Sequence, residues 1–261
     1  MNTYGGRGPS PEDPEIFSSD HREILLRAAE DIGWLLARGY PMSLAVQSVG
    51  DHHRLHARAR LALTRGCAVP SQARARVARR LAPSALAGMR VDVDGFNVII
   101  ALEVARGRGA LFRGVDSALR DLAGLRGSYR LQECTTDAVR ELLTFARDHG
   151  VATLCVWLDS PVSNSGRLSA LLAEQAARLD GITPCDEDLT PASHEGMALQ
   201  CKLVRNADAS LADAACAMSA DCVVIDRAQH WIDGPSAMLA SWAPHAWVID
   251  LSPARAIDGG G

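Results

Sequence analysis

The spacing of apolar and polar positions divides the chain into two parts with different periods. In residues 20–86, apolar side chains recur every three or four positions, as Ile24, Leu25, Ala28 and Ile32 do. This spacing predicts helices over about 21–39, 42–50, 54–65 and 70–82, with Gly39 and a following proline ending the first. From residue 89 onward, short apolar runs alternate with helical segments, which is the pattern of an α/β fold.

The second part contains six predicted strands, of which 89–94 alternates and 151–159 is a near-continuous apolar run, as in a strand buried on both faces. We expect strands at 89–94, 151–159, 181–185, 198–204, 222–226 and 246–251. We expect helices at 96–105, 115–125, 137–149, 166–179, 209–219 and 235–242. Such alternation predicts a mostly parallel sheet flanked by helices, of the Rossmann-like type.

These patterns suggest four regions along the chain. We expect a disordered tail over 1–18, an Arg-rich helical domain over 19–86, an α/β domain over 87–252 and a second disordered tail over 253–261. No apolar run approaches the roughly 18 residues of a membrane helix, so no membrane association is expected. A homo-oligomer is left open.

Composition changes this picture in two respects. The seven cysteines form no CxxC motif, and some lie in apolar runs, which indicates reduced, buried thiols and a cytoplasmic location. The net charge is −4, yet no acidic residue lies between Asp51 and Asp92, where nine arginines gather. This basic segment suggests a polyanionic partner such as nucleic acid, although a solvated arginine face is an equally good interpretation.

The candidate chemistry consists of aspartates that follow predicted strands. Asp94, Asp159 and Asp226 each end an apolar run, and in a parallel sheet such positions converge on one edge. Clustered carboxylates repel one another unless a cation joins them, and hard oxygen ligands suit Mg²⁺ or Mn²⁺. Asn97 could orient water or phosphate, while Asp221 and Asp208 are further candidates for the third ligand. The structural alternative is that these aspartates cap helices.

Two polar segments are candidates for substrate binding. Ser163, Asn164, Ser165 and Arg167 surround the start of a predicted helix, where free amides and hydroxyls could hold an anion or simply cap the helix. Arg120, Tyr129 and Arg130 belong to a second segment that could stack a base and contact phosphate, or could form a salt-bridged loop.

Several stretches resemble a known family. VDGFNVII, LRDLAGLRGSYR (119–130), LDSPVSNSGRL (158–168), VVIDRAQHWID (223–233) and the helical stretch 31–55 resemble domain of unknown function 434. More distantly, the Asp-Gly-x-Asn start at Asp94 is similar to PIN-like and NYN-type nucleases, which bind magnesium or manganese and cut RNA. The chain departs from that pattern because it lacks a clear Ser/Thr-x-Asp-x-Asp/Glu-Phe ending, and 185–197 looks like an insertion.

Three functions are therefore weighed. The first is a metal-dependent phosphodiester hydrolase, foremost a ribonuclease, which uses Asp94, Asn97, Asp159 and Asp226. The second is a non-catalytic RNA- or DNA-binding module on the same fold, with affinity from the Arg-rich helices. The third is an enzyme that acts on a phosphorylated small molecule.

Overall fold

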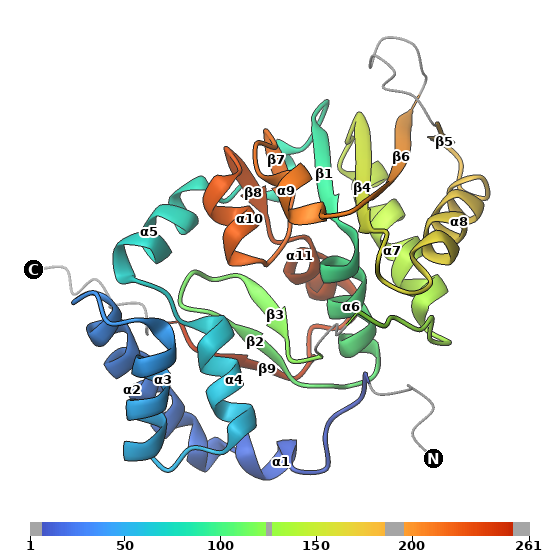
Figure 1. Ribbon diagram of the computed structural model, residues 1–261. Helices are drawn as coiled ribbons and strands as arrows, with labels where there is room; N and C mark the ends of the chain where they lie inside the picture. The colour runs from blue at the N-terminus through green and yellow to red at the C-terminus, as the bar shows by residue number, and fades with distance from the viewer. Residues whose placement is uncertain (1–6, 124–126, 186–195, 253–261) are drawn as a thin grey trace, which may run out of the picture. The chain divides into compact units, whose positions relative to one another are not determined.

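The computed structural model describes residues 7–123, 127–185 and 196–252 of the chain (Figure 1). These residues divide into two compact units. The first comprises 7–8, 79–109 and most of 123–246, and the second comprises 9–78, 110–122 and 247–252. The expected tail at 253–261, residues 1–6 and most of the expected insertion lie outside the described residues.

The first unit is built on a six-stranded sheet in the order β5-β6-β4-β1-β7-β8, and every pairing in it is parallel (Figure 1). Its strands are β1 (Arg90–Asp94), β4 (Thr153–Asp159), β5 (Ile182–Pro184), β6 (Met197–Val204), β7 (Cys216–Met218) and β8 (His230–Ile232). The expected α/β architecture with a parallel sheet and a helical N-terminal region is therefore confirmed.

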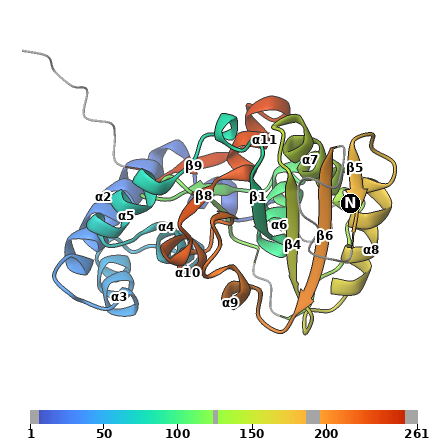
Figure 2. The ribbon, with the colours of Figure 1, turned by 90° about the horizontal axis from the view of Figure 1, so that it is seen from above.

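Helices flank this sheet. A short turn η1 (Pro83–Ala85) precedes it, and the helices are α6 (Gly95–Arg106), α7 (Thr135–Asp148), α8 (Ser165–Ala176), α9 (Ala207–Leu211), α10 (Cys222–Arg227) and α11 (Gly234–Trp242) (Figure 2). Helix α6 packs on β1 and β4 and is in turn contacted by α7 and α11. On the other face, Leu211 of α9 and Val224 of α10 pack with Ala217 of β7 and with Trp157.

Side chains of β1 alternate between the two faces. Val91 and Val93 are fully buried on one face, and Asp92 and Asp94 point to the other. Trp157 Nε1 donates to Asp92 Oδ1 at 2.9 Å, and the Arg90 guanidinium contacts the same carboxylate. Asp92 is therefore buried and paired.

Strand β1 marks the point where the strand order reverses. From β1 the chain builds outward through β4, and it later returns to add β7 and β8 on the opposite side of β1. Parallel sheets leave a crevice at such a switch point, outside the carboxyl ends of the strands. The ends of β1, β4 and β7 are thus the positions at which a functional site is expected.

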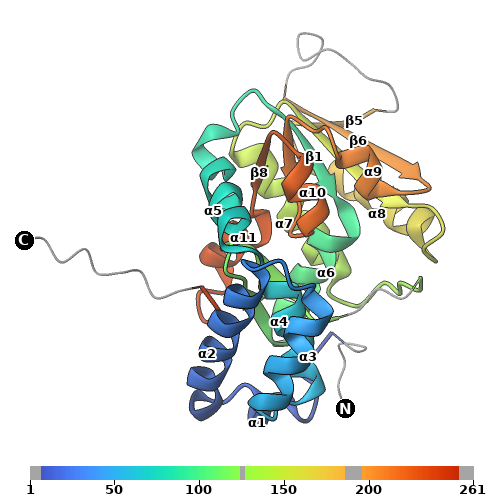
Figure 3. The same cartoon turned by 60° about the vertical axis from the view of Figure 1, so that its left-hand side comes forward.

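The second unit is a group of helices joined to a small sheet. The helices are α1 (Asp13–Ile16), α2 (Ser19–Leu36), α3 (Met42–His52), α4 (Ala57–Gly66) and α5 (Pro70–Arg79), and α2, α3 and α4 lie side by side (Figure 3). The sheet has the order β3-β2-β9 and consists of β2 (Leu111–Arg113), β3 (Leu119–Asp121) and β9 (Val248–Asp250). Leu25, Ile32 and Leu63 pack with Phe112 and Ile249 in one core.

Several expected elements are corrected by the structure. The expected disordered tail over 1–18 contains helix α1 (Asp13–Ile16), and both Asp13 and the following Phe17 are buried. The expected helix 115–125 contains β3, and the expected helix 209–219 divides into α9 and β7. The expected strand 222–226 is helix α10, and the last expected strand joins the small sheet. No helix in the described ranges is long and apolar enough to cross a membrane.

Candidate functional site

Asp94 occupies the carboxyl end of β1 and is only 8% exposed. Its Oδ1 accepts the amide of Asn97, so Asp94 caps helix α6. Its Oδ2 accepts a hydrogen bond from Ser219 Oγ at 2.9 Å. Gly95 follows at once, and a Cβ at this position would lie 2.5 Å from Leu158 Cδ2. Because glycine has no Cβ, the chain can turn from β1 into α6 in close contact with Leu158 of the neighbouring strand β4.

The segment that follows β7 completes this arrangement. Asn97 Oδ1 accepts the amide of Ala220 at 2.9 Å, and Ser219 Oγ accepts the amide of Asp221 at 3.0 Å. The first turn of α6 thus holds the 219–221 segment beside Asp94. Asn97 acts through its carbonyl oxygen on a backbone amide, a different contact from the expected one to water or phosphate.

Asp159 and Asp208 stand on the other side of β1. Asp159 ends β4 and accepts the amide of Ala207 at 2.8 Å, which ties the strand end to the start of α9. Asp208 follows in the first turn of α9, which packs on β1 and β4. Carboxylates from three separate parts of the chain are thereby brought to the crevice.

The electrostatics of these groups show that they share one environment. Burial, with smaller contributions from the nearby Asp208 and Asp221 carboxylates, raises the pKa of the Asp94 carboxyl to about 7, although hydrogen bonds from Ser219 and from the Asn97 amide act to lower it. Burial also raises the pKa of Asp208, and Asp221 and Asp159 add to that increase. Repulsion among close carboxylates is the condition that a bound cation relieves.

Asp226 does not belong to this group. It was expected to end a strand, but it lies on the exposed surface of α10. The physical reason is Asp221, whose Oδ1 accepts the amides of Val223 and Val224 at 2.7 and 3.3 Å. This cap starts a helix at Cys222, so the apolar run Val223–Ile225 is helical and Asp221 takes the position near Asp94.

The donor set fits a hard divalent cation. Carboxylate oxygens of Asp94, Asp208 and Asp221, with Asp159 beside them, are the ligands that Mg²⁺ and Mn²⁺ prefer. Within the described residues, no three side chains from histidine, cysteine, aspartate and glutamate are already arranged to hold a metal ion. Ser219 was not among the residues predicted from the sequence, and Asp208 was only a further candidate for the third ligand. A Ser-x-Asp signal at 219–221 was present, but it was hidden by the expected helix over 209–219.

The loop before α8 uses its polar groups internally. Ser163 Oγ accepts the amide of Tyr129 and donates to its carbonyl, and Asn164 Nδ2 donates to the same carbonyl at 2.7 Å. The amides of Ser163 and Ser165 donate to the carbonyls of Gly127 and Val162. Ser163 and Asn164 therefore fasten the loop to Tyr129, a use different from the two that the sequence left open, an anion site and a helix cap. Arg167 remains exposed in the first turn of α8.

The other expected substrate contacts are mostly structural. Tyr129 is fully buried, and its hydroxyl donates to Glu103 Oε1 at 2.6 Å, so its ring cannot stack on a base. Arg120 belongs to the second unit, where its guanidinium pairs with the buried carboxylate of Asp116. Arg130 is exposed.

Several arginines of the basic segment are committed to ion pairs. Arg58 pairs with Asp13, Arg60 with Asp51, Arg65 with Asp121 and Arg76 with Asp116. All four pairs lie within the second unit. Part of the clustered positive charge therefore forms ion pairs that join segments of the second unit.

Comparison with known proteins gives relatives without a described function. Residues 24–80 match the family model described as protein of unknown function (DUF434), and residues 83–184 match the domain of unknown function DUF5616. The uncharacterized protein MJ0935 of Methanocaldococcus jannaschii is 27% identical over 169 residues, which cover 62% of this chain and 81% of that protein. No solved structure matches the chain.

These matches refine the predicted resemblance. Asp94, Asn97 and Asp159 lie in the segment that matches DUF5616. VDGFNVII and the motifs at 119–130 and 158–168 lie there too, so most of the quoted motifs match DUF5616 and not DUF434. Asp208, Ser219 and Asp221 lie beyond both matched segments. The resemblance to the DUF434 family is therefore confirmed over residues 24–80, and it is followed by a DUF5616 segment that supplies the first half of the candidate site.

Proposed function

We propose that the protein is a metal-dependent phosphodiester hydrolase and that its substrate is RNA. The observation that carries this proposal is the set of coupled carboxylates, Asp94, Asp208 and Asp221 with Asp159 alongside, at the switch point of a parallel sheet. Asp94 is buried, Asp159 and Asp221 are half-buried and Asp208 is exposed. Like charges gathered around one buried carboxyl are costly for the fold, so their presence together calls for a chemical reason.

The residues have distinct tasks in this proposal. Asp94, Asp208 and Asp221 hold the cation, and Asp159 adds charge at the edge of the site. Ser219 and Asn97 position the 219–221 segment through their hydrogen bonds. A divalent ion bound here would lower the pKa of a water molecule and neutralise charge on the phosphate.

RNA is proposed because of the pattern around the acids. Asp94, Gly95 and Asn97 resemble the Asp-Gly-x-Asn start of PIN-like and NYN-type nucleases. The arginine ion pairs of the second unit count against the alternative in which those helices provide the main affinity for nucleic acid.

The test is cleavage of structured RNA by the purified full chain with Mn²⁺, compared with EDTA. We expect cleavage that Asp94→Asn and Asp208→Asn each reduce at least about a hundredfold, while the exposed control Asp226→Asn retains it. Equal cleavage by Asp94→Asn would refute the proposal. Turnover of a nucleotide diester with no turnover of RNA would instead support the alternative of a small-molecule enzyme.

A further inference from the structure

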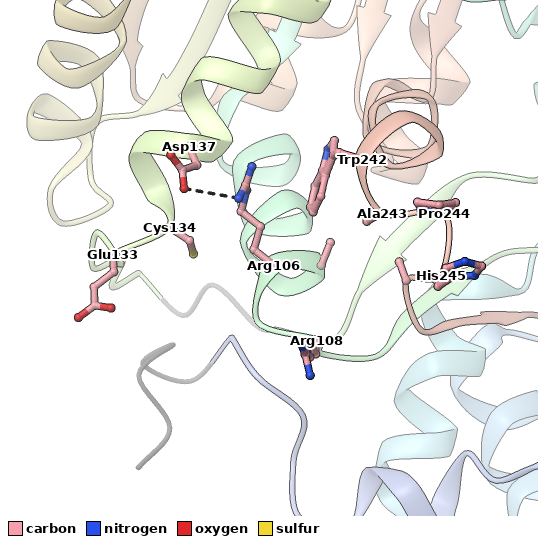
Figure 4. Close-up of a pocket in the computed structure, with 11 residues that line it drawn as sticks. Arg106, Arg108, Glu133, Cys134, Asp137, Trp242, Ala243, Pro244 and His245 are labelled. Atoms are coloured by element: carbon pink, nitrogen blue, oxygen red, sulfur yellow. Dashed lines mark hydrogen bonds and ion pairs between the residues drawn. The ribbon is translucent and has the colours of Figure 1, made fainter.

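A second candidate site lies at the far end of α6. Arg106 ends this helix, whose first turn is capped by Asp94, so the two ends are ~18 Å apart. A hollow of about 580 Å³ opens there, between the end of α6, the start of α7 and residues 242–246 (Figure 4). A second hollow of about 370 Å³ shares Arg106, Asp137 and Trp242 with it. The larger volume lies within the usual range of small-molecule sites.

The polar groups around these hollows are incompletely paired. Arg106 forms ion pairs with Glu141 and Asp137, and its guanidinium lies 4.6 Å from the centre of the Trp242 ring. Even so, Arg106 Nε, Trp242 Nε1 and Glu141 Oε2 are buried without a hydrogen-bond partner. Buried unpaired groups are uncommon and costly, so two donors and one acceptor in a single cluster require an explanation.

The chemistry of a suitable ligand follows from these groups. Ala105, Ala243, Pro244 and Ala246 contribute an apolar wall, and Trp242 an aromatic one, which suit a flat ring. Across the two hollows, Arg106, Arg108 and Arg140 stand against four acidic residues, Glu133, Asp137, Glu141 and Asp148, so an anionic ligand is disfavoured. Two unpaired donors require ring acceptors, and the unpaired acceptor requires an amino group.

We propose that the two adjoining hollows, which share Arg106 and Trp242, together bind an amino-substituted purine base or its nucleoside, independently of the aspartate site. Ring nitrogens accept from Trp242 Nε1 and Arg106 Nε, and the exocyclic amine donates to Glu141 Oε2. Because protein covers these three atoms, binding shifts the Arg106 and Trp242 side chains that line both hollows. The indole of Trp242 therefore reports on occupancy.

The test is titration of the full chain with adenosine in EDTA, followed by calorimetry and tryptophan fluorescence. We expect saturable binding that weakens about tenfold in Trp242→Phe, which keeps the ring and removes the donor. Purine riboside, which lacks the amine, should bind about tenfold more weakly than adenosine. Asp94→Asn should bind adenosine like the unaltered chain.

Two controls accompany this test: the melting temperature of Trp242→Phe checks that the variant is folded, and Asp94→Asn checks that adenosine does not bind at the aspartate site. Trp242→Phe removes an unpaired donor, so its melting temperature should stay close to that of the parent chain. Absence of saturable binding, equal binding by Trp242→Phe, or loss of binding in Asp94→Asn would each overturn the proposal. RNA cleavage can succeed or fail without affecting this result, because the two sites lie at opposite ends of α6.

Discussion

At the scale of single residues, the account depends on which aspartates share the crevice. Asp94 is held by Ser219, and Asp208 and Asp221 raise its pKa through their charge. The sequence placed Asp94 and Asp159 correctly at the ends of strands. It could not distinguish Asp221 from Asp226, because the four apolar residues between them fit a strand and a helix equally well.

The pH dependence of stability tests the environment of Asp94. Its pKa is about 7 in the folded protein and 3.8 ordinarily, so between these values the folded state keeps a proton that the unfolded state has lost. Metal-free stability should therefore fall as pH rises from about 4 to about 7, by up to roughly 4 kcal/mol.

Urea unfolding in EDTA at pH 5 and pH 8 measures this effect. Asp94→Asn removes the titrating group, while its Oδ1 can still accept the Asn97 amide and its Nδ2 can donate to Ser219 Oγ, whose hydroxyl can rotate. The variant should therefore lose this part of the pH slope and be at least as stable as the parent chain at pH 8. If Asp94→Asn were clearly less stable than the parent chain at pH 8, the ionised Asp94 carboxylate would not be destabilising the fold.

Asp208 and Asp226 form a matched pair for the assignment of the third ligand. Both are aspartates on short helices, but only Asp208 is coupled to Asp221 and Asp159. Calorimetric titration with Mn²⁺ should show affinity reduced about tenfold or more by Asp208→Asn and unchanged by Asp226→Asn. The opposite ranking would restore the sequence-based assignment of Asp226.

At the scale of elements, prediction from sequence succeeded for the long elements and failed around the short helix α10. Long apolar runs with clear ends gave β1, β4, α6 and α7 within a few residues. The 209–232 region failed because its elements are only a few residues long and depend on capping by Asp221 and on pairing with β1. Tertiary contacts, which a single sequence does not display, decide such short elements.

Asp221 serves α10 as well as the candidate site, and two substitutions separate these tasks. Asparagine is also a good helix cap, so Asp221→Asn should lose affinity for Mn²⁺ with little change in unfolding free energy. Asp221→Ala should lose both, with a cost of about 1 kcal/mol for the cap. Chemical unfolding beside Mn²⁺ titration checks this, and equal stability of the two variants would argue against the cap.

At the scale of the whole molecule, buried ion pairs join segments that are distant along the chain. In the first unit, Arg7 Nε donates to Glu103 at 2.9 Å, and the Arg7 guanidinium also lies 5.6 Å from the centre of the Tyr129 ring. Glu103 also accepts from Tyr129 and Thr135, and Tyr129 fastens the loop after β4. No local pattern in the sequence indicated that residue 7 packs on α6.

Removal of Arg7 tests this connection. Arg7→Ala leaves the buried Glu103 carboxylate without its cation, which should lower the unfolding free energy by about 3 kcal/mol. The control Arg178→Ala removes an exposed pair with Glu174 and should change it by less than about 0.5 kcal/mol. Similar losses for the two variants, measured by urea unfolding, would contradict a stabilising role for Arg7.

The proposed function requires that one cation binds Asp94, Asp208 and Asp221. Anomalous diffraction from a crystal of the full chain soaked in Mn²⁺ tests it most directly. The account predicts one strong peak within coordinating distance of these three carboxylates, at the carboxyl ends of β1 and β7. A peak at Asp226, or none in the crevice of a well-ordered crystal at millimolar Mn²⁺, would contradict it.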